Sequence, residues 1–323
     1  MGLPRTSADG VLFTTYNTLN LFAGDDAAGR ERYQQVVESI LSVGPDILAV
    51  QEIRAETGPV AYARLRRLAD DVGLRCGVPR AEGPGDQPAL ALGPHGYHCA
   101  LLWREDIEPV PGSLRCHGAG YFWHSLASVT LDVGGVLLRH AAHHASPFGR
   151  RLRADQNEML VALLAGAPTL VGADWNTECA DRVRDERTGD LVPYEPDPYA
   201  KVEWFDQMIY QCEWEYDEHG RRQARADRRP GDVLWAGGLY DAAAALNAPW
   251  QATVGHHPDD GYGARGVSRR IDGIRVTRQV LDALRAYHVT GTELARQASD
   301  HLPVTVEYVP AAAGLSPADM LRR

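Results

Sequence analysis

The sequence lacks the features that mark membrane and secreted proteins. It has no run of the roughly 18 apolar residues that a membrane-spanning helix needs, and its opening, MGLPRTSADG, has no apolar signal core. The five cysteines are an odd number, and no two stand at the CxxC spacing of a zinc knuckle. We therefore expect a cytoplasmic protein with reduced cysteines and no membrane insertion.

Motifs of several enzyme classes are also missing. The sequence contains no HExxH, the helical pair of histidines that zinc proteases use, and no GxSxG, the nucleophile turn of many serine hydrolases. It contains no GxxxxGK[ST] phosphate-binding loop either. Metalloprotease, serine hydrolase and nucleotide-driven kinase chemistry therefore have no motif support.

The charge balance limits how the protein can bind nucleic acid. Acidic residues number 43 and basic residues 33, a formal net charge of −10, which argues against a broad electropositive surface. The one concentrated basic run, 221–229, lies inside an otherwise acidic, polar stretch, 181–230. A local basic cleft stays possible, and the 44% hydrophobic content can fill a large core.

The hydrophobic pattern predicts alternating strands and helices without a linker between domains. Strands are expected at 11–20, 47–53, 99–103, 124–133, 135–143, 168–174, 269–276 and 304–309. Helices are expected at 30–41, 59–72 and 150–165, and a further helix at 232–246 that runs into two glycines. The stretch 77–96 is rich in Gly and Pro and predicts a long surface loop. The stretch 181–230 predicts either an elaborated loop with a solvated helix, which is preferred, or an insertion that contacts the substrate.

Polar residues recur where the predicted strands end. They are Asn17, Glu52, His143 or His144, Asp174, Asn176, Asp272, Asp300 and His301. In a sheet whose loops gather at one edge, such side chains can converge. Mg²⁺ prefers oxygen ligands, which Glu52, Asp300 and the amide of Asn17 would supply. The set therefore predicts phosphoryl transfer assisted by a hard cation.

Six segments carry a family resemblance when they are taken in order. TYNTLN, LAVQE, RHAAHH, GADWN, RRID and SDHLPV, spread over residues 11–309, resemble the endonuclease/exonuclease/phosphatase superfamily. The resemblance implies an α/β (α+β) fold of the DNase I type. This fold is a four-layer α/β/β/α sandwich of two packed, mostly antiparallel mixed sheets flanked by helices. It also implies a catalytic domain over 8–310, with an insertion at about 181–230, and a C-terminal tail over 311–323.

The resemblance implies a metal side to the site. Glu52 looks like the principal ligand of Mg²⁺ (or Mn²⁺), with Asn17 supporting it near the same ion. Asp300 stands where relatives place a ligand for a metal or for its water.

The resemblance also implies a phosphate side. His301 looks like the histidine at the scissile phosphate, with Asp272 accepting its other ring N–H. Asp174 resembles the residue that orients or deprotonates the attacking water, and Asn176 would donate to a phosphate oxygen. Whether Asp174 or His301 is the base stays open, and Asp174 is preferred.

Two further assignments are less tightly fixed. The histidine that stabilises the transition state is His143 or His144, since a slip of one residue moves a side chain to the other sheet face, and His143 is preferred. Arg270, beside the aspartate of RRID, and Arg151, after the histidine loop, are candidate phosphate contacts.

The expected function is metal-dependent hydrolysis of phosphodiester bonds by in-line attack of an activated water, with a nuclease preferred. The alternatives are a small-molecule or lipid phosphatase or phosphodiesterase, of the inositol phosphate or sphingomyelinase-like kind, and an inactive binding protein on the same scaffold. The expected partner is a phosphoester substrate, possibly a nucleic acid. The oligomeric state stays open.

Overall fold

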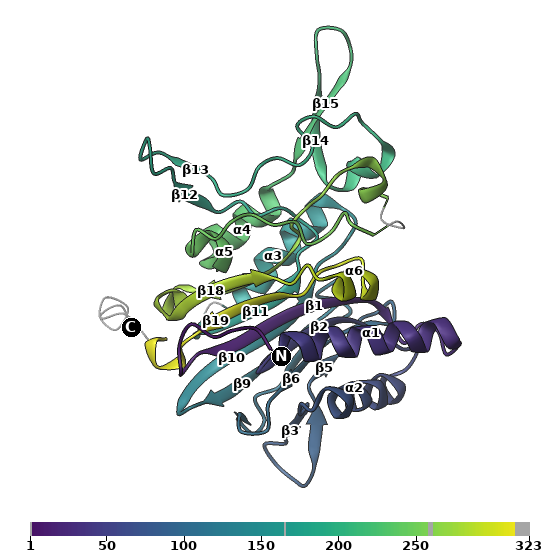
Figure 1. The fold of residues 1–323 in the computed structure, drawn as a ribbon, viewed down its shortest axis with the longest axis vertical. Coiled ribbons are helices and arrows are strands. Elements are labelled where there is room, and N and C mark those ends of the chain that lie inside the picture. The colour runs from purple at the N-terminus through teal and green to yellow at the C-terminus, as the bar shows by residue number, and fades with distance from the viewer. Residues whose placement is uncertain (1, 165, 258–260, 314–323) are drawn as a thin grey trace.

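The computed structural model describes residues 2–164, 166–257 and 261–313, and it shows two β-sheets packed face to face with helices outside (Figure 1). The first sheet has the strand order β18-β19-β1-β2-β6-β5. Its strands are β1 (Val11–Leu21), β2 (Ile47–Arg54), β5 (Leu90–Ala91), β6 (Tyr97–Trp103), β18 (Leu284–Val289) and β19 (Val304–Tyr308).

The second sheet has the order β16-β17-β11-β10-β9-β7, with β8 also paired to β9. Its strands are β7 (Glu108–Pro109), β8 (Arg115–His117), β9 (Leu126–Val133), β10 (Val136–His144), β11 (Thr169–Asp174), β16 (Leu239–Asp241) and β17 (Asp272–Thr277). The β1–β2 and β10–β11 pairs are parallel and the other pairs of both sheets are antiparallel. Both sheets are therefore mixed and mostly antiparallel, as predicted.

Helices cover the outer face of each sheet and complete the four layers. The helices are α1 (Ala27–Val43), α2 (Gly58–Val72), α3 (Arg150–Leu164), α4 (Arg229–Ala236), α5 (Ala242–Ala245) and α6 (Glu293–Ala298). The short 3-10 helices are η1 (Asp206–Tyr210), η2 (Gly263–Arg265), η3 (Arg278–Ala283) and η4 (Pro310–Ala312). Apolar residues of α1 and α2 pack on the first sheet, and those of α3 and α4 pack on the second. The expected four-layer sandwich is confirmed.

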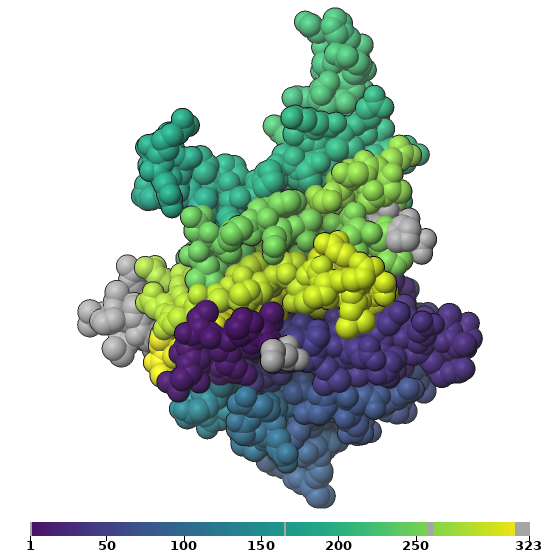
Figure 2. All heavy atoms as spheres, in the orientation of Figure 1, coloured from purple at the N-terminus to yellow at the C-terminus, as the bar shows by residue number. Residues whose placement is uncertain are grey.

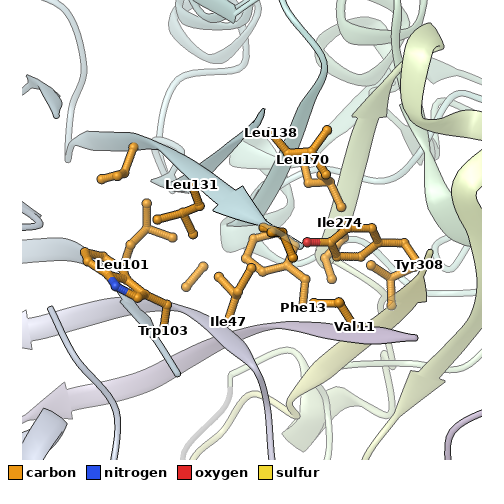
Figure 3. Close-up of a cluster of buried hydrophobic side chains, with 14 of the residues drawn as sticks. Val11, Phe13, Ile47, Leu101, Trp103, Leu131, Leu138, Leu170, Ile274 and Tyr308 are labelled. Carbon is orange, nitrogen blue, oxygen red and sulfur yellow. The ribbon is translucent and has the colours of Figure 1, made fainter. Parts of the chain in front are cut away.

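Alternation along the strands fills the core between the sheets. Phe13, Ile47 and Leu101 from the first sheet meet Leu131 and Leu170 from the second, and all five are fully buried (Figure 3). Their neighbours along each strand point the other way, toward the helices. Strands buried on both faces explain why these segments read as near-continuous apolar runs.

Gly172 on β11 lets the two sheets approach closely. A Cβ atom at this position would lie 2.8 Å from the Cβ of Thr15 on β1 and 3.0 Å from the Cβ of Ala49 on β2. Cβ atoms are fixed by the backbone and cannot rotate away. The absence of a side chain at 172 therefore sets the spacing between β11 and β1 two residues before Asp174 and Asn17.

Several predicted segments differ from the structure. The stretch 77–96 is not a plain loop but holds β3 (Gly77–Pro79), β4 (Asp86–Pro88) and β5. The predicted helix at 232–246 is split into α4, β16 and α5, because the chain turns at Gly238, whose φ is 81°. The strand β18 was not predicted.

The insertion also differs from the expected loop with a solvated helix. It forms two hairpins, β12 (Arg182–Arg184) with β13 (Leu191–Pro193), and β14 (Cys212–Tyr216) with β15 (Arg222–Ala226). Figures 1 and 2 show both hairpins as separate projections from one end of the sandwich.

The domain bounds 8–310, with an insertion at 181–230, stay a prediction. Of the expected tail 311–323, residues 314–323 lie outside the described residues. Within the part of the chain that the structure describes, no helix is long and apolar enough to cross a membrane.

Gly172→Ala tests the close approach of the sheets. We expect it to lower the free energy of unfolding by about 1–3 kcal/mol, the usual cost of overpacking a core, measured by urea denaturation. Gly166→Ala is the matched control, because a Cβ at Gly166 would meet no atom within 4 Å. Equal stability of the two variants would contradict this account.

Candidate active site

A bulge at the end of β2 turns Glu52 into the site. Ala49 and Gln51 face the second sheet, and Val50 and Ile53 pack on the helices. Regular alternation would send Glu52 to the helix side with Val50. Instead Glu52 has a φ of 68°, and the pairing of β2 with β6 shifts register between Val50 and Ile53. The extra residue leaves the Glu52 carboxylate free to turn back toward β1.

Asn17 joins the carboxylates of the two sheets. Its Nδ2 donates to Oδ2 of Asp174 at 3.0 Å and to Oε1 of Glu52 at 3.3 Å. Its Oδ1 accepts the backbone N–H of Leu19 at 3.1 Å, which fixes the orientation of the amide. The backbone N–H of Asn20 donates to Oε2 of Glu52 at 2.7 Å. Asn17 thus presents its nitrogen, and not the predicted oxygen ligand, to the carboxylates.

Asp174, at the end of β11, is the centre of the cluster. Its side chain is 2% exposed, and Oδ1 accepts the backbone N–H of Asn176 at 2.9 Å. Oδ2 lies 3.2 Å from Nε2 of His144 and 3.9 Å from Nε2 of His301. Its charged neighbours in these contacts are imidazoles, so the carboxylate has no arginine or lysine bonded to it among the described residues.

His301 is held by a buried carboxylate. Its Nδ1 lies 2.9 Å from both oxygens of Asp272, and Thr253 donates its hydroxyl to Asp272 at 2.6 Å. Nε2 of His301 faces Asp174, with Oδ1 of Asp300 3.8 Å away. The Asp272 bond fixes the ring so that Nε2 is the atom presented to the cleft.

Neighbouring charges decide the protonation states. Although burial opposes the charged form, Asp272, Asp300 and Asp174 together raise the pKa of His301 well above its ordinary value. Burial also opposes the charged form of Asp174. The neighbouring His144 and His301 outweigh this effect, so the pKa of the Asp174 carboxyl is held below its usual range. Without a bound cation, these shifts favour the ionised form of Asp174 and the protonated form of His301.

The choice of His143 over His144 is corrected by the structure. His144 pairs with Asp174 across the β10–β11 ladder and faces the site. His143 points to the opposite face, where its Nδ1 lies 3.0 Å from the carbonyl oxygen of Ser125 and its ring packs against Phe122 in the helix-side core. The reason is that adjacent residues of a strand such as β10 face opposite sides of the sheet.

The two predicted phosphate contacts are not at the site. Arg270 is buried, and its guanidinium donates to Glu195 of the insertion and, at 3.0 Å, to Asp241 of β16. It is therefore a structural ion-pair residue and not a substrate contact. Arg151 is exposed on α3, and it does not line either of the described cavities beside Asp174 and His301.

Two cavities meet at His301. One, of about 390 Å³, is lined by Glu52, Asp174 and His144 among others, and Phe148 also lines it. The other, of about 310 Å³, is lined by Asp300 and by residues of the insertion. His301 and Asn176 line both, so the predicted catalytic groups lie at the junction of a continuous cleft. The predicted residues Asn17, Glu52, Asp174, Asn176, Asp272, Asp300 and His301 are thus brought together.

The donor set fits a hard divalent cation. Asp174, Asp272 and His301 offer ligand atoms within 4.8 Å of one another. Asp272 is already committed to His301, and the other carboxylates that line the cavities beside this group are Glu52 and Asp300. These carboxylates share one cleft with no lysine among its described lining residues, and an Mg²⁺-like ion would balance their charge.

A protein-family model matches most of the chain. The model of the Endonuclease/Exonuclease/phosphatase family matches residues 14–301. The chain belongs to this family. Its members hydrolyse phosphoester bonds, and the protein is an enzyme of that kind. A comparison with curated proteins finds no match.

Solved structures of the family share the fold. An AP endonuclease from Archaeoglobus fulgidus has a TM-score of 0.56 at 17% identity, covering 92% of this chain and 99% of that chain. Humanized D. rerio TDP2 has a TM-score of 0.56 at 13% identity, with 93% and 99% covered. A mannosyl-6-phosphatase from Bacteroides thetaiotaomicron has a TM-score of 0.54 at 17% identity, with 93% and 99% covered. At these identities the likeness establishes the fold alone.

Three supporting residues were missed by the sequence analysis. His124 stacks on His144 with ring centroids 3.9 Å apart, and burial together with His144 lowers the pKa of His124 to about 2, so it is a neutral partner. Thr253 orients Asp272, and Ser299 donates its hydroxyl to the carbonyl oxygen of Asn17 at 2.8 Å. His124 stands at the start of a predicted strand and Ser299 begins the segment SDHLPV, whereas Thr253 lies outside every predicted strand and quoted segment.

Arg270→Ala tests the reassignment of Arg270. It would leave Glu195 and Asp241 buried without their cation, so we expect a loss of about 3–5 kcal/mol in unfolding free energy, measured by urea denaturation. Arg151→Ala is the control and should be neutral. If Arg270→Ala folds with unchanged stability and raises KM instead, Arg270 is a substrate contact after all.

Proposed function

We infer that the protein hydrolyses phosphodiester bonds with the help of a divalent cation, Mg²⁺ or Mn²⁺, and that it acts as a nuclease. One observation carries the proposal. The Asp174 carboxyl group, held by Asn17 and His144 from the two sheets, lies 3.9 Å from Nε2 of His301, whose ring Asp272 orients through Nδ1. Such a pair places a proton acceptor and a charge-stabilising donor at one point.

Asp174 is the proposed water-activating residue. Its Oδ1 is anchored by the backbone N–H of Asn176, and its Oδ2 faces the cleft. A carboxylate with a depressed pKa is a modest base, so its main effect is to orient the water for in-line attack and to accept its proton as the P–O bond forms. His301 is less suited as the base, because the neighbouring carboxylates raise the pKa of its imidazole above the ordinary value.

The phosphate side is formed by imidazole and amide donors. Nε2 of His301 would donate to a nonbridging oxygen, and His144 would stabilise the added charge of the five-coordinate transition state. Asn176 donates from Nδ2 to the carbonyl oxygen of Ala145 at 3.1 Å. Its role in phosphate binding requires that this bond be exchanged for one to the substrate.

The cation is assigned to Glu52, with Asp300 on the other side of His301. When bound, such an ion supplies Lewis-acid stabilisation of the phosphoryl oxygens and the leaving group. Asn17 would act by positioning Glu52 and Asp174 and not by ligation, because its amide oxygen is committed to Leu19.

A diester is favoured over a monoester by the shape of the cleft. Cavities open on both sides of His301, so both ester arms of a substrate find room. A phosphatase for small molecules or lipid headgroups, and a binding protein without activity, are the competing functions. A panel of nucleic acids, nucleotides, inositol phosphates and sphingomyelin, assayed with Mg²⁺ and Mn²⁺, separates them.

We also propose a cytoplasmic location. All five cysteines are free, and four of them are buried without a disulfide, as suits a reducing compartment.

Glu52→Gln tests the cation. Chelation should abolish hydrolysis of the wild type, and added Mg²⁺ or Mn²⁺ should restore it. In Glu52→Gln the metal concentration that gives the half-maximal rate should rise by more than roughly 100-fold. Removal of a residue that only supports a metal ligand lowers metal affinity by up to about 100-fold, and loss of the ligand itself should cost more. Glu105→Gln, at an exposed turn, is the control. Activity that survives chelation would refute metal dependence.

Two adjacent histidines test the strand register. His144→Gln should lower kcat by about 10²–10³-fold, as expected for removal of one donor to the transition state, with a near wild-type melting curve. His143→Leu should keep kcat within a few fold and change only the stability. The reverse pattern, with kcat lost in His143→Leu, would restore the rejected register.

A further inference from the structure

We propose that the cleft binds a single-stranded nucleic acid by stacking its bases on two aromatic walls, one on each side of the scissile phosphate. The inference rests on the proposed phosphodiester hydrolysis and specifies its substrate. We define the first wall as His95, Tyr97 and Trp123, and the second wall as Phe148 and Tyr210.

The first wall lines the 390 Å³ cavity beside Asp174 and His144. His95 packs on Trp123 with centroids 4.4 Å apart and planes 36° apart, which holds the indole in one orientation. The Arg54 guanidinium lies 4.7 Å from the centroid of the Tyr97 ring and holds that ring in the same way. Half-buried rings that are already ordered lose little entropy when a ligand stacks on them.

The second wall brings the insertion to the site. Phe148 and Tyr210 meet edge to face with centroids 5.1 Å apart, and they are 47% and 39% exposed. Phe148 lines both cavities, and Tyr210 lines the 310 Å³ cavity. Buried Arg153 donates to the carbonyl oxygens of Ser146 at 2.8 Å and Tyr210 at 2.6 Å, so it is a positioning residue that ties the two supporting loops together.

The two walls are joined across the catalytic groups. Trp123 and Phe148 are in edge-to-face contact at 5.9 Å, and His301 and Asn176 lie at the junction of the two cavities. A chain whose phosphate reaches His301 therefore meets an aromatic surface in both directions. Two rings as exposed as Phe148 and Tyr210 leave apolar area in water that a stacked base would cover.

Charge favours stacking over phosphate neutralisation. Apart from histidines, Arg269 is the one basic side chain among the described residues that line the two cavities. A duplex held by its phosphates, or a polyphosphorylated inositol, would need several such cations. Bases are accessible to stacking only when they are unpaired, so the substrate is a single strand.

A quaternary ammonium headgroup is the competing ligand for an aromatic wall. The first wall suits it less well, because the Arg54 cation already lies over the Tyr97 ring. A headgroup in the first cavity would also leave Tyr210 without a ligand, because that ring lines the other cavity. We therefore assign the walls to nucleobases and treat a choline diester as an outcome of the test.

The experiment compares substrates that differ only in their bases. A single-stranded oligodeoxynucleotide, its duplex, the same strand with abasic sites flanking one phosphate, and glycerophosphocholine are assayed with Mg²⁺ or Mn²⁺. We expect kcat/KM for the single strand to exceed that for the abasic strand by about 5- to 150-fold per base, and the duplex to be cut more slowly. Rates should depend weakly on salt.

Trp123→Ala and Phe148→Ala locate the stacking. Each should shrink the ratio of kcat/KM between base-containing and abasic strands by about 5- to 150-fold. Tyr121→Ala is the matched control, since Tyr121 is 49% exposed on the same loop as Trp123 and lines neither described cavity. It should leave the ratio unchanged.

Distinct results overturn the two levels of the proposal. Hydrolysis of both strands at equal rates, or a ratio that Trp123→Ala leaves unchanged, overturns the stacking alone. A preference for glycerophosphocholine that Trp123→Ala removes overturns it in favour of a headgroup site. If no diester is hydrolysed, the proposed function fails. Fluorescence anisotropy of labelled strands, measured with chelator, then decides whether bases still bind, and equal affinity for the abasic strand refutes the inference.

Discussion

The site depends on how closely the two sheets approach at Gly172. The side chains of Thr15 and Ala49 pack so closely against Gly172 that they leave no room for a side chain at this position. Two residues farther along the same strands, Asn17 and Asp174 are then near enough to form a 3.0 Å hydrogen bond. A wider spacing would leave Asn17, Glu52, Asp174 and His144 on the ends of two separate sheets, without a shared centre. The packing of small residues in the core thus fixes the geometry of charged residues at its edge.

The negative charge of the site exceeds the positive charge that directly opposes it. Four carboxylates gather there, and the positive groups that oppose them directly are imidazoles. Burial of such an excess of negative charge costs folding free energy, and the cost falls when histidines become protonated or a cation binds. The left-handed backbone at Glu52 adds strain of the kind found at functional sites. The protein is therefore built for its bound state more than for its empty one.

Much of this site could be predicted from sequence because each polar residue lies within or next to an apolar strand, with Asp272 at the start of β17 and His301 just before β19. The facing of the β10 side chains could also have been predicted from the sequence. Arg139 must point away from the core between the sheets, and strand alternation then places His140 and His144 on the inner face. The bulge that turns Glu52 was hidden, because it depends on pairing with both neighbouring strands. Arg270 was misassigned because its partners, Glu195 and Asp241, come from segments far away in the chain. The aromatic walls were not predicted for the same reason, as their rings come from four segments that are far apart in the sequence.

The anchoring of the insertion has a consequence for engineering. Its base is fixed by Arg270 with Glu195 and by Arg275 with Asp181, whose bond is 2.9 Å long, and all four side chains are buried. The turns at the far ends of its hairpins project away from the sandwich (Figure 1). Those two turns are permissive positions for grafting a fluorophore, an affinity peptide or a targeting module, since a change there leaves the anchored base and the reaction centre untouched.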